Sequence, residues 1–214
     1  MSGISPARCQ DHCGMTMMKI DYPEGATPLR DEELRGLIPT HIATRPELDR
    51  FEQENINEAL AWVEDRRPKN ILNASFLKTL HKRMFCNVWK WAGTFRPHET
   101  TPIGVDVFQI STQLMQLLGD VEFWIKSNDP SEDEIAVRFH HRLVWIHLFP
   151  NGNGRHARLV TDILLENVLG RPIFTWGSKN LAKAGKDRTT YIESLQAADS
   201  FSCDYKPLLE FARS

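Results

Sequence analysis

The sequence predicts an all-α protein: a single-domain helical bundle with one short β-hairpin. Apolar residues recur at intervals of three and four along most of the chain, and capping residues precede the main periodic runs. Residues 89–112 are the exception, because they show no helical period. No internal repeat or linker divides the 214 residues, of which 41% are hydrophobic, so we expect one domain with a sizeable core.

Two helices are predicted in the first half of the chain. Thr44 is followed by Pro46 and Glu47, a typical helix start, and the apolar spacing then predicts a helix over residues 45–64. A second helix is expected from Asn73 to about residue 85. A short helix is also expected before these two, ending at Pro39.

The non-helical segment has the partial alternation of a hairpin. Ile103, Val105 and Val107 are apolar at every second position, which predicts a β-hairpin at about 97–110. A helical period resumes at Leu114 and stops before Pro130.

The second half of the chain is predicted to be helical almost throughout. Ser131 and the acidic residues behind it begin a helix that ends near residue 146 and is apolar on most sides. Another starts near Gly154 and is closed by Gly170. The last helices are expected at about 178–198 and 204–212.

The charge balance excludes some classes of protein. The chain has 26 Lys and Arg against 28 Asp and Glu, a net charge of −2, which argues against a protein built to grip nucleic-acid backbones. No apolar stretch approaches the roughly 18 residues of a membrane span. We therefore expect no direct nucleic-acid binding, no membrane insertion and a cytoplasmic location. Residues 1–18 are interpreted as a flexible N-terminal extension.

One segment between two predicted buried helices carries chemistry. In residues 147–158 (HLFPNGNGRHAR), two glycines flank Asn153 at the start of a helix, so backbone N–H groups can converge on an anion. Arg155 and Arg158 follow on one helix face, and two guanidinium groups beside such an amide nest suit a di- or triphosphate.

His147 stands at the edge of this anion site, where a neutral imidazole could take a proton from an attacking hydroxyl. No Ser or Cys is placed beside it as an enzyme nucleophile. The pattern therefore favours nucleotidyl or phosphoryl transfer. The alternative is a glycine-rich turn whose arginines only pair with carboxylates.

The pattern His-x-Phe-x-x-Gly-Asn-Gly-Arg-x-x-Arg over residues 147–158 resembles the Fic (Fic/Doc) domain family. Residues 92–96 (AGTFR) resemble the segment before the family's hairpin flap, and the spacing of Arg188, Tyr191 and Leu195 resembles its closing helix. Residues 22–29, 37–42 and 52–56 are similar to the subfamily called mobile mystery protein B. The resemblance covers about residues 19–212.

The resemblance implies a Fic fold and a protein adenylyltransferase, which moves AMP from ATP to a Ser, Thr or Tyr hydroxyl of a target protein. His147 would be the base, the loop would hold the α- and β-phosphates, Arg155 would lie on the β/γ end, and Arg158 would hold the γ-phosphate. The implied phosphate-binding residues are Gly152, Asn153, Gly154, Arg155 and Arg158. The flap that would dock the target by strand addition includes Thr101, Ile103, Gly104 and Val105.

The resemblance also divides the chain into the extension 1–18, an N-terminal helical segment 19–72 and a Fic core 73–214 with the flap at about 97–110. Many Fic proteins carry an inhibitory glutamate, and our hypothesis is that Glu54 reaches Arg158 and holds the enzyme off. A solvated glutamate on an amphipathic helix is the alternative. Trp176 and Tyr191 are candidates for the base pocket, with core packing as their alternative.

Asn151 departs from the family pattern. The family usually has Asp or Glu there, and that carboxylate holds the Mg²⁺ (or Mn²⁺) on the phosphates, whereas an amide is a weaker ligand without charge. Three interpretations follow: the same reaction with weaker metal use, another nucleotide or phosphate donor, or lost activity. In the last case the chain would be a Fic module in a two-component, toxin–antitoxin-like pair, whose companion helix-turn-helix protein the subfamily implies.

Overall fold

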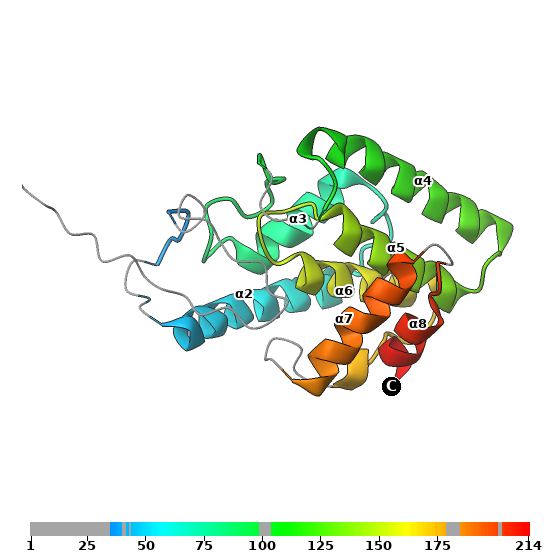
Figure 1. Cartoon of the computed structure of the whole chain (residues 1–214). Coiled ribbons are helices and arrows are strands. Elements are labelled where there is room, and N and C mark those ends of the chain that lie inside the picture. Colours follow the sequence, from blue (N-terminus) through cyan, green and yellow to red (C-terminus); the bar gives the residue numbers. More distant parts are fainter. Residues whose placement is uncertain (1–34, 40–41, 43, 99–103, 179–184, 201–202) are drawn as a thin grey trace, which may run out of the picture.

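The computed structural model describes residues 35–39, 42, 44–98, 104–178, 185–200 and 203–214. The described chain is mostly helical, as predicted, and two antiparallel helices at its centre, α5 and α6, are surrounded by the others (Figure 1). The α-helices are α2 (Arg45–Arg66), α3 (Ala74–Phe85), α4 (Ile110–Ser127), α5 (Glu132–Ile146), α6 (Asn153–Ile163), α7 (Lys186–Asp199) and α8 (Lys206–Arg213). Helix α3 packs on α6, and both α4 and α8 pack on α5.

The helices begin where the capping residues predict. The Thr44 hydroxyl accepts from the Glu47 backbone N–H, and the Glu47 carboxylate accepts from the Thr44 N–H at 3.0 Å, which makes a complete capping box for α2. The Ser131 hydroxyl also caps α5, by accepting from the Glu134 backbone N–H. These two caps fix the starts of the helix that borders the site and of the helix that leads into it.

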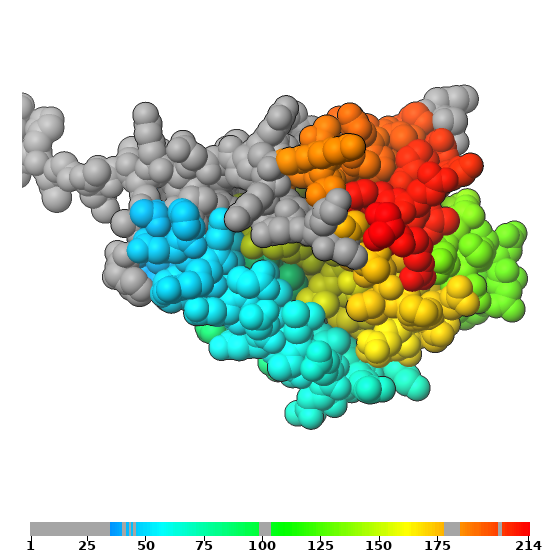
Figure 2. Space-filling view, turned by 90° about the horizontal axis from the view of Figure 1, so that it is seen from below, coloured from blue at the N-terminus to red at the C-terminus, as the bar shows by residue number. Residues whose placement is uncertain are grey.

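The core has two parts. The larger part fills the space between α2, α3, α4, α5 and α6. The smaller part lies where α5 meets α7 and α8, and it includes Trp176 and Tyr191. Figure 2 shows the face on which α2 and α3 (blue to cyan) lie beside the chain that follows α6 (yellow). A hydrogen bond from the Asn167 amide to the Pro68 carbonyl (3.2 Å) joins these two regions.

The structure differs from the sequence-based expectations in three places. Val107–Gln109 form a 3-10 helix, η1, where the second half of a hairpin was expected, because the Asp106 side chain caps that turn by accepting from Phe108 N–H. Leu164–Leu169 form a π-helix, η2, in place of the last turns of α6. Residues 35–37, expected to lie in a short helix, form a turn and an isolated bridge from Leu37 to Trp89.

Some expectations concern residues outside the described part of the chain. The extension 1–18 is among them, as are Thr101 and Ile103 of the flap. Within the described ranges, no helix is both long and apolar enough to cross a membrane. A short 3-10 turn, η3 (Trp176–Ser178), precedes the gap before α7.

Candidate active site

The loop that joins α5 to α6 is closed by the side chain of Asn153. Its Oδ1 accepts from the Phe149 N–H (2.9 Å) and its Nδ2 donates to the Phe149 carbonyl (2.7 Å). His147 ends α5 in the left-handed conformation, with φ 57°, and Gly152 begins α6 with φ 76°. No side chain caps the first turn of α6, so its backbone N–H groups face outward from the helix start.

Packing explains why the loop has glycine at position 152. A Cβ there would lie 2.7 Å from the ring of Phe85, and the positive φ adds strain for any other residue. The neighbouring Phe149 is completely buried, with its ring stacked on His81 at 3.7 Å between centroids. The loop therefore packs closely against α3, through the contacts of Gly152 with Phe85 and of Phe149 with His81.

His147 has the surroundings of a neutral imidazole. It is 6% exposed, and among the described residues neither ring nitrogen has a hydrogen-bond partner. Burial lowers its pKa to about 4, and the nearby Arg96 guanidinium acts in the same direction. The ring is therefore uncharged at neutral pH, which is the state a general base needs.

Arg96 ties the described end of the flap segment to the end of α5. Its Nε donates to the His147 carbonyl at 2.6 Å, and its Nη2 donates to the carbonyls of Val105 and, at 3.5 Å, Ile146. Gly104 lies against both His147 and Arg96, since a Cβ there would be 2.8 Å from the His147 Cβ and 2.9 Å from the Arg96 Nη2. In the sequence, Arg96 stands out only as the last residue of the segment 92–96 (AGTFR), and no local pattern indicates this role.

The two arginines of the loop turn toward different neighbours. The Arg155 Nη1 lies 2.7 Å from the Glu52 Oε2, and its guanidinium lies over the Phe85 ring. Arg158 lies over the ring of Tyr191 in α7, 5.6 Å from its centroid. A Cβ on Gly154 would be 3.6 Å from the Arg158 Nη1, so this second cation stands beside the first turn of α6.

The carboxylate that α2 brings to the site is Glu52 rather than Glu54. Glu52 is 2% exposed and accepts from Trp89 Nε1 (2.7 Å) as well as from Arg155. The Glu54 carboxylate is exposed and lies 3.6 Å from Arg50, its neighbour one turn earlier. The expected contact between Glu54 and Arg158 was therefore wrong, because the two glutamates lie about 200° apart around the helix axis.

Trp176 and Tyr191 lie in the smaller core. Trp176 Nε1 donates to both oxygens of Asp162 (3.0 and 3.2 Å), and the Tyr191 hydroxyl lies 2.9 Å from His140 Nε2. Burial raises the pKa of Asp162 to about 7, against the opposing effect of the Trp176 bond. These contacts favour core packing over the lining of a base pocket.

The side chains present do not fit a protein-held Mg²⁺ ion. The Asn151 Oδ1 accepts a hydrogen bond from the Gly152 N–H at 2.5 Å, and the Asn151 main-chain oxygen is 3.1 Å from His81 Nε2. No cluster of three or more His, Cys, Asp or Glu suited to a metal occurs in the described ranges. Magnesium sites in proteins normally include a carboxylate, and the loop offers only an amide.

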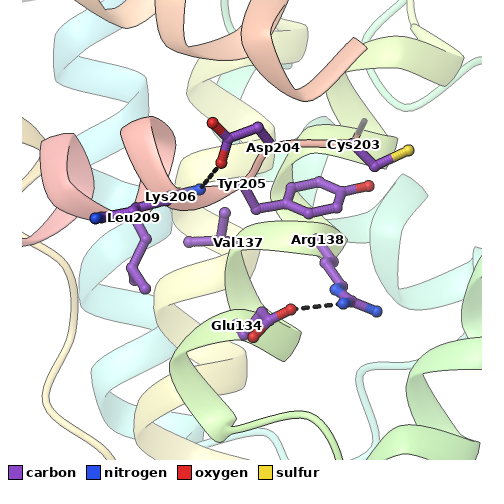
Figure 3. A pocket seen from close by; sticks show the side chains of 8 residues that line it. All are labelled: Glu134, Val137, Arg138, Cys203, Asp204, Tyr205, Lys206 and Leu209. Atoms are coloured by element: carbon purple, nitrogen blue, oxygen red, sulfur yellow. Dashed lines mark hydrogen bonds and ion pairs between the residues drawn. The ribbon is translucent and has the colours of Figure 1, made fainter. Parts of the chain in front are cut away.

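A cavity of about 290 Å³ lies away from this loop, between α5 and the start of α8 (Figure 3). Two pairs lie within its polar lining: Arg138 Nη2 lies 2.5 Å from Glu134, and the Lys206 backbone N–H donates to the Asp204 side chain. None of residues 147–158 lines it, so it is separate from the loop chemistry.

Comparisons of the sequence and of the fold with known proteins both find Fic proteins. Residues 71–165 match the model of the Fic/DOC family. The protein adenylyltransferase Fic of Nematostella vectensis is 25% identical over 185 residues, which are 83% of this chain. The chain spans about two fifths (41%) of the length of that relative.

Two solved structures share the fold. The N-terminal FIC domain of Bep8 from Bartonella sp. 1-1C has a TM-score of 0.65 and 17% identity, over 84% of this chain and 95% of that one. BepC from Bartonella tribocorum with bound AMPPNP has a TM-score of 0.63 and 18% identity, over 86% and 97%. Residues 71–165 therefore match the Fic/DOC family model, and the chain shares the fold of these Fic structures.

Proposed function

We propose that this chain is a protein adenylyltransferase that transfers AMP from ATP to a Ser, Thr or Tyr hydroxyl of a target protein. The observation that carries the proposal is the buried, neutral imidazole of His147, placed one loop before the uncapped start of α6. The relative from Nematostella vectensis, which is named a protein adenylyltransferase, supports the same reaction class.

In the proposed reaction, an imidazole nitrogen of His147 takes the proton of the target hydroxyl. The hydroxyl oxygen then bonds to the α-phosphorus of ATP, the bond from that phosphorus to the bridging oxygen breaks, and pyrophosphate leaves. Asn153 and Gly154 offer backbone N–H groups at the start of α6, where the helix dipole favours negative charge, and the Gly152 N–H would join them on leaving the Asn151 Oδ1. Arg155 and Arg158 would neutralise the departing phosphates.

The target would approach along the flap. Val105 is buried and held by Arg96, whereas Gly104 is exposed and lies against His147. A target main chain laid along Gly104 and Val105 would therefore bring its hydroxyl to the imidazole.

We further propose that Glu52 restrains the enzyme. Arg155 cannot give its full set of donors to a phosphate while its Nη1 is held by the Glu52 carboxylate at 2.7 Å. Glu52 is buried and also anchored by Trp89, so the ion pair has a fixed geometry. Nucleotide binding would have to replace this contact.

The test is incubation of the chain with ATP labelled at the α- or the γ-phosphate, with Mg²⁺ or Mn²⁺, for the wild type and His147→Ala. Label from the α-phosphate that appears on protein and disappears with His147 supports AMP transfer. Label from the γ-phosphate alone would instead show phosphoryl transfer, one of the alternatives that Asn151 leaves open. Absence of label from any nucleotide, with a companion protein still bound, would contradict the enzyme and support the two-component module.

A further inference from the structure

His81 lies inside the molecule at the contact between α3 and the loop. Its side chain is 0% exposed, and its ring is stacked on Phe149 with 17° between the planes. The ring of Phe85 lies on another side, 4.8 Å away between centroids. The packing leaves the imidazole in one orientation.

Both ring nitrogens of His81 contact backbone groups from distant parts of the chain. The Gly93 N–H points at Nδ1 over 3.0 Å, and Nε2 lies 3.1 Å from the Asn151 carbonyl oxygen. Nδ1 must accept, because its partner is a donor, and so the single ring proton is on Nε2 and is donated to Asn151. Burial lowers the pKa of His81 well below its usual value, which agrees with this neutral form.

The bond to Asn151 reaches the start of α6 through one peptide group. The carbonyl of Asn151 and the N–H of Gly152 belong to the same planar unit, so fixing the first fixes the direction of the second. Gly152 also sits directly on the two rings, since a Cβ there would be 3.4 Å from His81 Nε2 and 2.7 Å from Phe85. The orientation of this peptide sets how the chain enters the helix whose first turn faces the phosphates.

We propose that His81 is a positioning residue for the phosphate-binding loop, acting through its Nε2 bond to Asn151 while its Nδ1 bond holds Gly93 at the approach to the flap. This inference rests on the proposed function, because it assumes that the loop binds nucleotide. His81 itself touches no substrate in this account. Its effect is to keep one peptide orientation at residues 151–152.

Two substitutions of His81 each keep only one of its two hydrogen bonds, the one to Asn151 or the one from Gly93. His81→Gln places an amide near the position of Nε2 and can still donate to Asn151, whereas His81→Asn places its amide near Nδ1 and keeps only the contact with Gly93. His156→Gln is the matched control, because His156 is equally buried in the same ring cluster but its Nε2 contacts Leu77 instead of the loop. Thermal melting of the three variants measures their general structural cost.

We expect His81→Asn to weaken binding of a non-hydrolysable ATP analogue about tenfold, the effect of one buried hydrogen bond left unsatisfied. The KM for ATP should rise by a similar factor with a smaller change in kcat. His81→Gln and His156→Gln should bind the analogue within about threefold of the wild type, a difference too small for a lost buried hydrogen bond. Equal losses in His81→Asn and His81→Gln, or losses that only follow the fall in Tm, would overturn the proposal.

Hydrogen exchange of the protein without nucleotide distinguishes this inference from the proposed function. If the wild type binds no ATP, the proposed function fails. Faster exchange at residues 151–154 in His81→Asn than in His81→Gln would still support the positioning role. Equal exchange in the two variants would overturn it, whatever the nucleotide result.

Discussion

Glu52 and Arg155 form an ion pair of 2.7 Å that joins helix α2 to the first turn of α6 across 103 positions of sequence. Glu52 lies outside the segment that matches the Fic/DOC family model, and Arg155 lies within it. The pair therefore connects the N-terminal helix to the anion-binding loop. It also engages Arg155, one of the two arginines that would neutralise the departing phosphates in the proposed reaction.

Glu52→Gln should release Arg155 and raise affinity for ATP about tenfold. The glutamine Oε1 can still accept from Trp89 Nε1, so the main loss is the charge that holds Arg155. The free energy of unfolding should fall by about 1–3 kcal/mol. Calorimetric titration with an ATP analogue and chemical denaturation measure the two effects.

Glu54→Gln is the matched control for this variant, because Glu54 is on the same helix but exposed and paired with Arg50. It should leave both ATP affinity and stability unchanged. If Glu54→Gln raises the affinity and Glu52→Gln does not, the assignment of the restraint to Glu52 is wrong.

Arg96→Lys should lower the rate of transfer and the stability together. Lysine keeps the charge but cannot donate at once to the carbonyls of His147 and Val105, because it lacks the rigid guanidinium fork. Loss of these buried bonds should cost about 2–4 kcal/mol in the free energy of unfolding. Arg142→Lys is the control, since Arg142 donates to the Gln113 side chain and lies over the Trp145 ring, and neither contact involves the loop. Equal effects of the two substitutions would contradict the role given to Arg96.

Acid should destabilise the fold, beginning near pH 6.5. Burial lowers the pKa of His140 to about 3 and those of His147 and His156 to about 4, so below the ordinary value of 6.5 the unfolded chain binds protons that the folded chain does not. Each such histidine lowers the free energy of unfolding by about 1.4 kcal/mol per pH unit in that range. Asp162 has the opposite effect on stability. Its raised pKa of about 7 means that the folded state takes up a proton before the unfolded state does, which raises the free energy of unfolding as the pH falls.

Denaturation curves recorded between pH about 7 and about 5 measure this slope. These three histidines, together with His81 and His141, whose pKa values burial also lowers, outweigh one carboxyl group, so the free energy of unfolding should fall in acid. His156→Gln should reduce the slope of the free energy of unfolding against pH by the contribution of one histidine, about 1.4 kcal/mol per pH unit. A stability that is flat or rises over this range would show that the buried histidines do not stay neutral.

Asn151→Asp should change the metal dependence of transfer. A carboxylate at this position supplies the charged ligand that Mg²⁺ prefers, so the concentration of metal needed for half-maximal rate should fall by about tenfold. The variant also removes nothing from the bond to His81, which uses the main-chain oxygen. An unchanged metal requirement would show that this position does not lie beside the metal.

The helices and the loop could be predicted because their signals are local. Thr44 and Ser131 each cap a helix through the residue three positions on, and the glycines of the loop lie within a few residues of one another. A glycine at position 152 is typical of a residue with positive φ, and Gly152 has a φ of 76°. Such short-range patterns predicted the helical fold, which the structure confirms.

The parts that could not be predicted depend on distant contacts. Glu52 and Glu54 look equivalent on a charged helix, and only Trp89 and Arg155 decide which of them is buried. The sequence around His81 does not distinguish it from other residues of α3. Its role depends on its contacts with Gly93 and Asn151, which are distant in the sequence. The 3-10 turn at Val107–Gln109 replaced the expected hairpin because a side-chain cap outweighed a weak alternation.

The central claim is that His147 removes the proton of the target hydroxyl without itself holding the nucleotide. The most direct measurement compares ATP-analogue binding and AMP transfer in His147→Ala, with thermal melting to confirm that the variant is folded. The account predicts binding within about twofold of the wild type and transfer reduced about a hundredfold or more. Transfer at the wild-type rate, or a loss of binding as large as the loss of transfer, would contradict it.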